Sequence, residues 1–422
     1  MRAVEAITVA VATLGLVVTR PRGLNEGVAA LLGGGLTLAL GLVSLQAGVQ
    51  LELSSWNIFL FFLGMMALAA LSDQSGVFDL VAFLAARFAR GRAALLYGAV
   101  FLVGGIISLL FANDSAALVL TPIVYALVVR LALDPLPFVF ATTFIADTAS
   151  VGLPVSNPLN VIVIDKFHLG LVSYVSYLWL PALIAVVINV AAFYLIFHRS
   201  LGRRFARMPQ PEMRPGLRSS MTVLAVVAAA YLVASALVFS LGVVAVAGAA
   251  ALTINLRRLG MLDVRRLLRE ISWPIFGFIG GMLLVVRGLG NAGVTGALGH
   301  ALVRTAGSSH LATIGATVVG TAIGSNLINN LPMALVMTNT VPSLHVNAST
   351  RLDLVYSTIL GADLGPNLTH LGSLATFIWL FFLRRQGMDI SAWDYFRIGI
   401  VVTPIMLVGA ILGLWLTSGG TL

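Results

Sequence analysis

Long apolar runs, separated by short polar segments, fill the chain from end to end. The first half predicts apolar helices at 4–19, 25–46, 55–72, 93–112, 115–131, 137–165 and 171–197. The second half predicts them at 220–239, 242–256, 272–287, 309–325, 331–344, 352–383 and 396–417. Runs of about 20 apolar residues cross a bilayer as helices, and their continuity excludes the period-two alternation of membrane β-barrels. Two amphipathic helices are predicted at 76–91 and 292–306. The pattern indicates an all-α polytopic membrane protein.

Composition and charge agree with this class. Of 422 residues, 59% are hydrophobic and only 10% are charged, whereas soluble domains carry about 25% charged residues. The net charge of +9 does not indicate nucleic-acid binding, because most cations lie in short loops between apolar runs. The absence of cysteine excludes disulfides and thiolate ligands. We expect 4–19 to be a retained span, since Glu5 and the lack of a small-residue cleavage site argue against a signal peptide.

The two halves of the chain share a pattern. The Trp-x-Ile-Phe-x-Phe-x-x-Gly-Met motif at 56–65 recurs at 273–282, a shift of 217 positions. Asn113 and Asp147 recur as Asn329 and Asp363, both at a shift of 216. Three separate matches within one residue of a common shift predict an internal repeat. The predicted organisation is a first repeat at 1–200, a basic cytoplasmic linker at 201–219 and a second repeat at 220–422.

The distribution of cations predicts how the repeats are oriented. If the paired runs at 93–131 and 309–344 are re-entrant hairpins, each half crosses the membrane five times, and the repeats are inverted. The loops that this topology places in the cytoplasm then hold 20 of the 25 cations, as the positive-inside rule requires. The predicted fold therefore has about ten transmembrane helices, two re-entrant hairpins, two broken helices, and both termini outside.

Three carboxylates lie deep inside predicted membrane segments: Asp114, Asp147 and Asp363. A charged group at that depth costs roughly 2.5–3.5 kcal/mol on insertion scales, so it is a functional candidate. The alternative is a structural role in capping a broken helix. No Arg or Lys lies in the same segments to neutralise these groups. We expect one of them, Asp147 first, to carry protons.

Polar residues gather at the hairpin tips and at the interrupted helices around 152–154 and 365–366. Helix breaks at membrane depth are tolerated where the backbone is buried or lines a cavity. The candidate substrate-binding residues there are Asn113, Asn157, Asn160, Asn329, Asn330, Asn367, Thr369 and His370. Such side chains also satisfy backbone groups freed at the breaks, and a lone histidine is often only a hydrogen-bonding group. No metal-ligand motif is present.

The motifs at 111–123, 144–150, 155–160, 328–333 and 361–373 together resemble the arsenite/antimonite efflux permeases, the ArsB family. The resemblance covers nearly the whole chain. It implies a secondary active transporter, not an enzyme, in the bacterial cytoplasmic (inner) membrane. It also implies efflux of the neutral trihydroxy species of As(III) and Sb(III) in exchange for protons, without a cofactor. The wider ion transporter superfamily is similar in its inverted repeats, which implies alternating access of elevator type. The partners that the resemblance implies for this chain are the metalloids, protons and membrane lipid, with a cytosolic ATPase subunit as a further candidate.

Other functions remain open at this point. A Na⁺/H⁺ antiporter would also use Asp and Asn ligands. A sodium-coupled anion carrier is disfavoured by the acidic residues at the tip and break. An intramembrane enzyme that uses two Asp residues as acid and base is the most distant alternative. Arsenite efflux and Na⁺/H⁺ exchange can be distinguished by expressing the protein in a sensitive bacterium. An arsenite efflux pump protects it against arsenite but not against Na⁺ or Li⁺.

Overall fold

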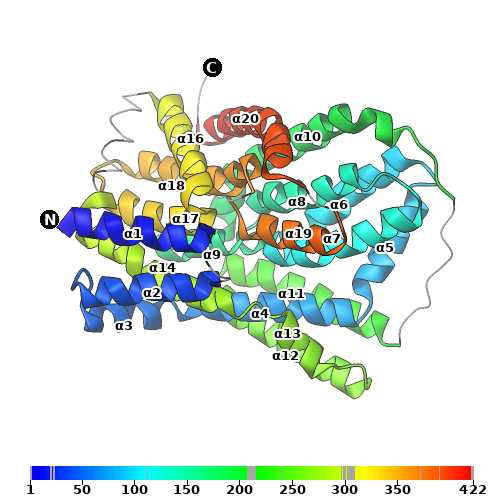
Figure 1. The fold of residues 1–422 in the computed structure, drawn as a ribbon, viewed down its shortest axis with the longest axis horizontal. Coiled ribbons are helices and arrows are strands. Elements are labelled where there is room, and N and C mark those ends of the chain that lie inside the picture. Colours follow the sequence, from blue (N-terminus) through cyan, green and yellow to red (C-terminus); the bar gives the residue numbers. More distant parts are fainter. Residues whose placement is uncertain are drawn as a thin grey trace.

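The computed structural model describes residues 2–419 except positions 20, 22, 23, 112, 207–214, 238, 296, 298–300, 302–308, 371 and 389. The first half contains α1 (Arg2–Thr19), α2 (Glu26–Ala39), α3 (Leu45–Ser54), α4 (Trp56–Gln74), α5 (Val77–Phe88), α6 (Ala93–Phe111), α7 (Asn113–Arg130), α8 (Leu136–Ala149), α9 (Pro158–Phe167) and α10 (Leu171–Leu201). The second half contains α11 (Leu217–Ala236), α12 (Leu241–Arg258), α13 (Val264–Glu270), α14 (Pro274–Asn291), α16 (His310–Ile328), α17 (Asn330–Thr340), α18 (Ala348–Leu364), α19 (Leu374–Arg385) and α20 (Ala392–Thr417). In the described part of the chain, seven helices are long and apolar enough to cross a membrane, with α13 and α14 counted as one. The all-helical prediction is confirmed (Figure 1).

The predicted single span at 25–46 is wrong. Helix α2 ends at Ala39, and the chain reverses through Gly41, whose φ of 67° favours glycine. Ser44 then caps α3, its side chain accepting from the backbone nitrogen of Ala47 at 3.2 Å. The capping signal at Ser44 lay inside an apolar run, and hydropathy alone could not separate the two helices. The predicted amphipathic helix at 76–91 is present as α5, whereas most of 292–306 lies outside the described residues.

Both interrupted spans are broken as predicted. Between α8 and α9 the chain forms two single-turn 3₁₀ helices, η2 (Ser150–Gly152) and η3 (Pro154–Ser156). Between α18 and α19 it forms η5 (Gly365–Leu368). Helices α16 and α17 meet at Asn329, whose φ is 74°. These breaks bring polar side chains into the interior.

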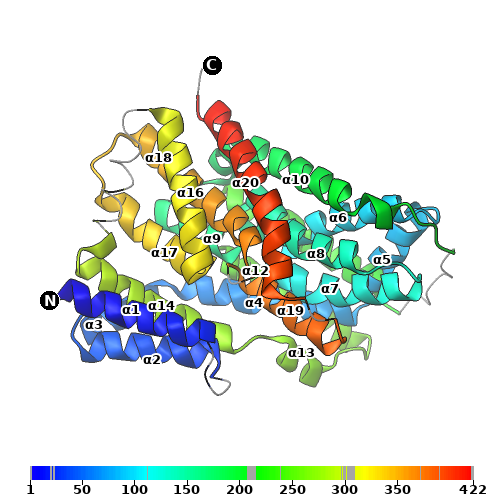
Figure 2. The same ribbon diagram turned by 45° about the horizontal axis from the view of Figure 1, so that its top comes forward.

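Close packing joins helices from different halves. Helix α2 lies against α14, and α4 lies against α12. A Cβ atom at Gly281 would be 2.2 Å from the backbone carbonyl of Ala30, and one at Gly64 would be 2.4 Å from the backbone of Ala245. Glycine therefore lets these backbones touch. Figure 2 shows α1, α2, α3 and α14 in one layer, with α10 and α20 side by side in another.

At one end of the molecule, two pairs of polar loops contact each other. The backbone N–H of Phe205 donates to the carbonyl of Gly91 at 2.9 Å. Gln74 Nε2, at the end of α4, donates to the carbonyl of Asp263, just before α13, at 3.2 Å. Segments that the sequence places in the cytoplasm thus contact one another.

The opposite end gathers loops that hold few cations. Asn291 Nδ2 donates to the carbonyl of Leu42 at 2.9 Å, which joins the ends of α14 and α2. Thr417 Oγ1, in the last turn of α20, donates to the carbonyl of Tyr177 at 2.7 Å. In Figure 1 the start of α1 lies at this end and α5 lies at the other.

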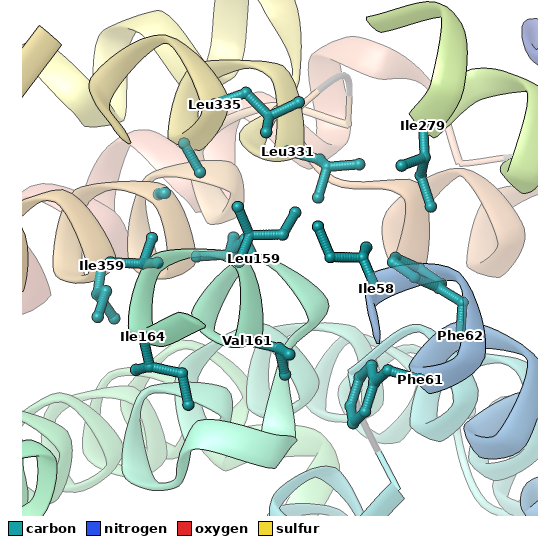
Figure 3. Packing of buried hydrophobic residues seen from close by; sticks show 14 of the residues in the cluster. Ile58, Phe61, Phe62, Leu159, Val161, Ile164, Ile279, Leu331, Leu335 and Ile359 are labelled. Atoms are coloured by element: carbon teal, nitrogen blue, oxygen red, sulfur yellow. The ribbon is translucent and has the colours of Figure 1, made fainter. Parts of the chain in front are cut away.

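A shared apolar core positions the half-helix α9. Figure 3 shows Leu159 of α9 among Leu331 of α17, Ile58 of α4 and Ile359 of α18. All four side chains are at most 7% exposed. The helix that follows the first break is therefore fixed against helices of both halves, and so are the polar residues at its first turn.

Candidate functional site

The carboxylate of Asp147 lies in the last turn of α8, directly before the first break. Its side chain is 1% exposed. Asn113 Nδ2, in the first residue of α7, donates to Asp147 Oδ1 at 2.8 Å. Ser373 Oγ, just before α19, donates to the same oxygen at 3.1 Å. Two helix N-termini thus lie beside this carboxylate, and the partial positive charge of a helix N-terminus stabilises an anion.

Asp363 lies in the equivalent place, the last turn of α18, and is completely buried. Asn157 Nδ2 donates to Asp363 Oδ1 at 2.5 Å, and Asn160 Nδ2 donates to Oδ2 at 3.0 Å. Asn157 is also the N-cap of α9, where its Oδ1 accepts from the backbone nitrogen of Leu159 at 3.2 Å. Asn157 and Asn160, which the sequence predicted at the first break, therefore donate hydrogen bonds to the carboxylate in the second half of the chain.

Each carboxylate is bound by the helix break of the other half. Asp147 and Asp363 are 216 positions apart, and so are their partners Asn157 and Ser373. The Asp147–Ser373 bond and the Asp363–Asn157 bond are therefore one contact formed twice, with the halves exchanged. The arrangement holds the two acidic groups in a single polar centre.

Among the asparagines of this centre that the sequence predicted, three carry amide oxygens without a donor. The Oδ1 atoms of Asn113, Asn160 and Asn367 are buried and accept no hydrogen bond from any described residue. A buried polar atom left without a partner costs about 1–3 kcal/mol. Hydroxyl groups of a small ligand are donors that would satisfy such acceptors.

Asn189 is a residue of this centre that the sequence reasoning missed. It lies within α10, is completely buried, and its Nδ2 donates to Thr148 Oγ1 at 2.7 Å. Asn367 Nδ2 donates to the same hydroxyl oxygen at 3.3 Å. Asn189 is the only amide side chain in the predicted helix 171–197. That isolated polar residue was the signal which could have found it.

At the second hairpin tip, the asparagine side chains form hydrogen bonds with the backbone. Asn329 Oδ1 accepts from the backbone nitrogen of Leu331 at 3.3 Å, and Asn330 Oδ1 accepts from the same nitrogen at 2.9 Å. The backbone nitrogen of Asn330 donates to the carbonyl of Gly372 at 2.9 Å. The tip is therefore joined to the second break, and its two side chains cap the start of α17.

Asn326, close to that tip, stabilises the second break. Its Nδ2 donates to the carbonyl of Gly365 at 2.7 Å, and its Oδ1 accepts from Thr369 Oγ1 at 2.8 Å. His370 follows and is partly exposed. Asn326 belongs to the same polar run as the predicted tip residues, and only the fold distinguishes its partners from theirs.

The third predicted carboxylate, Asp114, lies in the first turn of α7, and its side chain is outside the described residues. Within the described ranges, no cluster of three or more His, Cys, Asp or Glu side chains could hold a metal ion. The polar centre is thus made of two carboxylates, amides and hydroxyls.

Comparison with known proteins gives this centre a context. The sequence model of the family described as "Arsenical pump membrane protein", ArsB, matches residues 5–417. The chain belongs to this family. It is 34% identical over 408 residues to the arsenical pump membrane protein of Escherichia coli K12, covering 94% of this chain and 95% of that protein. It is 33% identical over 408 residues to the protein of the same name from Yersinia enterocolitica, with the same coverage.

The family membership is consistent with the architecture. Members are named as membrane pumps, and the apolar helices make this arsenical pump family member a multi-pass protein of the bacterial inner membrane. Among solved structures, the chain is similar to the YdaH transporter of Alcanivorax borkumensis, with a TM-score of 0.62, 14% identity and 87% of each chain covered. That likeness concerns the fold alone.

Proposed function

We propose that the chain is a secondary active transporter that extrudes arsenite and antimonite, as neutral trihydroxy species, in exchange for protons. The observation that carries the substrate chemistry is the set of buried amide oxygens on Asn113, Asn160 and Asn367. As(OH)₃ offers three O–H donors to such acceptors. The absence of cysteine suits a transporter, because thiolates bind As(III) tightly and hinder its release.

The substrate site is proposed to extend over both breaks and both tips. Its proposed residues are Asn113, Asn157, Asn160, Asn329, Asn330, Asn367, Thr369 and His370. Those that bind a carboxylate, such as Asn113 and Asn160, are the ones we expect to sense its protonation. Those that cap the backbone, such as Asn329, are expected to shape the site instead.

Asp147 and Asp363 are the proposed proton carriers, with Asp114 as a third candidate. Two carboxylates in one buried polar centre repel each other when both are ionised, which favours protonation of one of them. Protonation changes which partner donates the hydrogen bonds at Asp147, and hence the donors open to a substrate. A proton that moves through about 150 mV releases about 3.5 kcal/mol, enough for a metalloid gradient of several hundredfold.

Alternating access of elevator type is proposed to move this site across the membrane. The repeated carboxylate contact and the paired contacts Ala30–Gly281 and Gly64–Ala245 support two repeats of inverted topology. In this proposal α1–α4 and α11–α14 form a scaffold with tight glycine contacts. The hairpins and broken helices form the part that moves past it.

Metal tolerance tests the proposal. The full chain is expressed in an arsenite-sensitive bacterium that lacks its own pump, beside a variant in which Asp147 and Asp363 are both replaced by Ala. We expect the native chain, and not the variant, to raise tolerance to arsenite and antimonite without raising tolerance to Na⁺ or Li⁺. Tolerance to Na⁺ or Li⁺ alone would contradict metalloid efflux and favour a Na⁺/H⁺ antiporter.

A further inference from the structure

The end of the molecule where α20 terminates holds a second titratable pair, outside the site described above. His310 Nε2, at the start of α16, lies 3.0 Å from Asp353 Oδ2 on α18. Ser418 Oγ, directly after α20, lies 3.1 Å from the same nitrogen. The His310 side chain is 33% exposed, whereas that of Asp353 is 3% exposed. The pair therefore joins solvent to the protein interior.

Helix α18 runs from this pair to the polar centre. Asp353 and Asp363 are ten residues apart on it, which is about 15 Å along a helix axis. Tyr356 lies between them, and its hydroxyl is 2.7 Å from Ser173 Oγ of α10. The ring of Tyr174 is centred 6.3 Å from that of Tyr356. Hydroxyl groups of two helices thus occupy the interval between the two carboxylates.

Two buried polar atoms in this interval have no hydrogen-bond partner among the described residues. They are Asp353 Oδ1 and Ser357 Oγ. Tyr174 OH donates to the carbonyl of Val151, in the first helix break, at 3.0 Å. Tyr174 is also close enough to Asp363 to interact electrostatically. The hydroxyls of Tyr356, Ser173 and Tyr174 therefore lie between Asp353 and the first break, whose Asn157 and Asn160 bind Asp363.

The charged and titratable groups that face Asp353 are few. His310 comes from α16 and Tyr177 from α10, where Tyr177 is close enough to Asp353 to interact electrostatically. The described end of α20 contributes the neutral Ser418, and α17 carries no ionisable side chain. On α18 itself, Arg351 is exposed. The imidazole is therefore the titratable partner in direct contact with this carboxylate.

We propose that the His310–Asp353 pair takes up protons from the outer aqueous phase and that the hydroxyls of α18 and α10 connect it to Asp363. This inference rests on the proposed proton exchange. A proton from water binds the imidazole and passes to the carboxylate of Asp353. Each hydroxyl in the series then accepts one proton and releases another, so that only Asp363 gains a proton at the end.

The test uses inverted membrane vesicles, in which the outer face of the protein lines the lumen. Arsenite uptake driven by an acidic lumen is measured at lumenal values from about pH 5 to 8, the range in which histidine titrates. Arsenite counterflow at equal pH is measured in the same vesicles. The variants are Asp353→Asn and His310→Gln. Their matched controls, Glu5→Gln and His345→Gln, alter exposed residues that touch neither partner of the pair.

We expect Asp353→Asn to reduce pH-driven uptake by about tenfold or more, as for loss of a proton-transfer group, with counterflow within about twofold of wild type. His310→Gln retains a donor to Asp353 but cannot carry a proton, so we expect it to reduce pH-driven uptake by about tenfold or more as well. Wild-type pH profiles for both variants would overturn the inference, as would an equal loss of counterflow and uptake. If the wild-type chain itself ignores the pH gradient, the proposed proton exchange fails instead.

Discussion

Amide side chains serve two purposes at the centre of this protein, because each carries both a donor and an acceptor. Asn113 and Asn160 direct their Nδ2 groups to carboxylates and leave their Oδ1 atoms open. The carboxylates are thereby held in place while buried acceptors remain without a donor. A serine or threonine could donate to the carboxylate but could not present a carbonyl-type acceptor at the same time.

Asn189 tests this residue-scale account away from the carboxylates. Replacement by Leu removes the 2.7 Å bond to Thr148 Oγ1 and leaves that buried hydroxyl with fewer partners. We expect arsenite affinity to fall by an amount equivalent to about 1–3 kcal/mol, while the amount of folded protein in the membrane changes little. Equilibrium binding of radioactive arsenite to the purified protein measures the change.

Asn255→Leu is the matched control. Asn255 lies on α12 and donates to Ser220 Oγ at 3.1 Å, so it removes a comparable bond far along the chain from both breaks. An equal loss of arsenite affinity in both variants would show that Asn189 acts only through stability.

Much of this site could be predicted at the scale of single residues. Asp147 and Asp363 are functional candidates from the sequence alone, because a charged group deep in the membrane is costly. Hydropathy could not show which amides reach them, since Asn113, Asn157 and Asn329 look alike in sequence. Asn157 reaches Asp363 because the fold brings break and carboxylate together, whereas Asn329 caps α17.

At the scale of elements, close helix contacts hold the two halves together. Gly281→Ala places a methyl group against the Ala30 carbonyl, where no flexible side chain can yield. We expect a loss of stability of about 1–3 kcal/mol. The loss is measured as a lower midpoint in heat-induced aggregation of the detergent-purified protein.

Gly98→Ala, on α6, is the control for this prediction. Nothing lies within 4 Å of a Cβ atom at Gly98, so the change should be neutral or slightly stabilising, because alanine favours helix over glycine. A midpoint for Gly281→Ala at or above that of wild type would contradict the close-contact account.

Most of the helical elements were predictable, and the two that were missed are α3 and the seven-residue α13. Apolar runs located most helices, and prolines, glycines and asparagines marked both breaks. Helix α3 was missed because it is short and follows α2 after only five residues. A window long enough to detect a membrane span averages over such a reversal.

At the scale of the whole molecule, the partition of cations predicts which end faces the cytoplasm. The naturally cysteine-free chain allows single cysteines to test it. Arg130→Cys, at the end of α7, should react with a membrane-impermeant thiol reagent only from the cytoplasmic side. His345→Cys, before α18, should react only from outside; both native side chains are exposed.

Labelling of the Arg130→Cys protein exclusively from outside would reverse the predicted orientation. It would also place the His310–Asp353 pair on the cytoplasmic face. The unlabelled parent chain controls for reaction at other side chains, since it contains no thiol.

The central claim is that buried carboxylates couple metalloid efflux to protons. It is tested most directly by arsenite accumulation in inverted vesicles under an imposed pH gradient, with Asp147→Asn and Asp363→Asn compared with wild type. Asparagine keeps an acceptor for Ser373 or Asn157 but cannot exchange a proton. We predict that at least Asp147→Asn abolishes pH-driven accumulation while arsenite counterflow at equal pH persists. Accumulation at the wild-type rate in both variants would contradict the account.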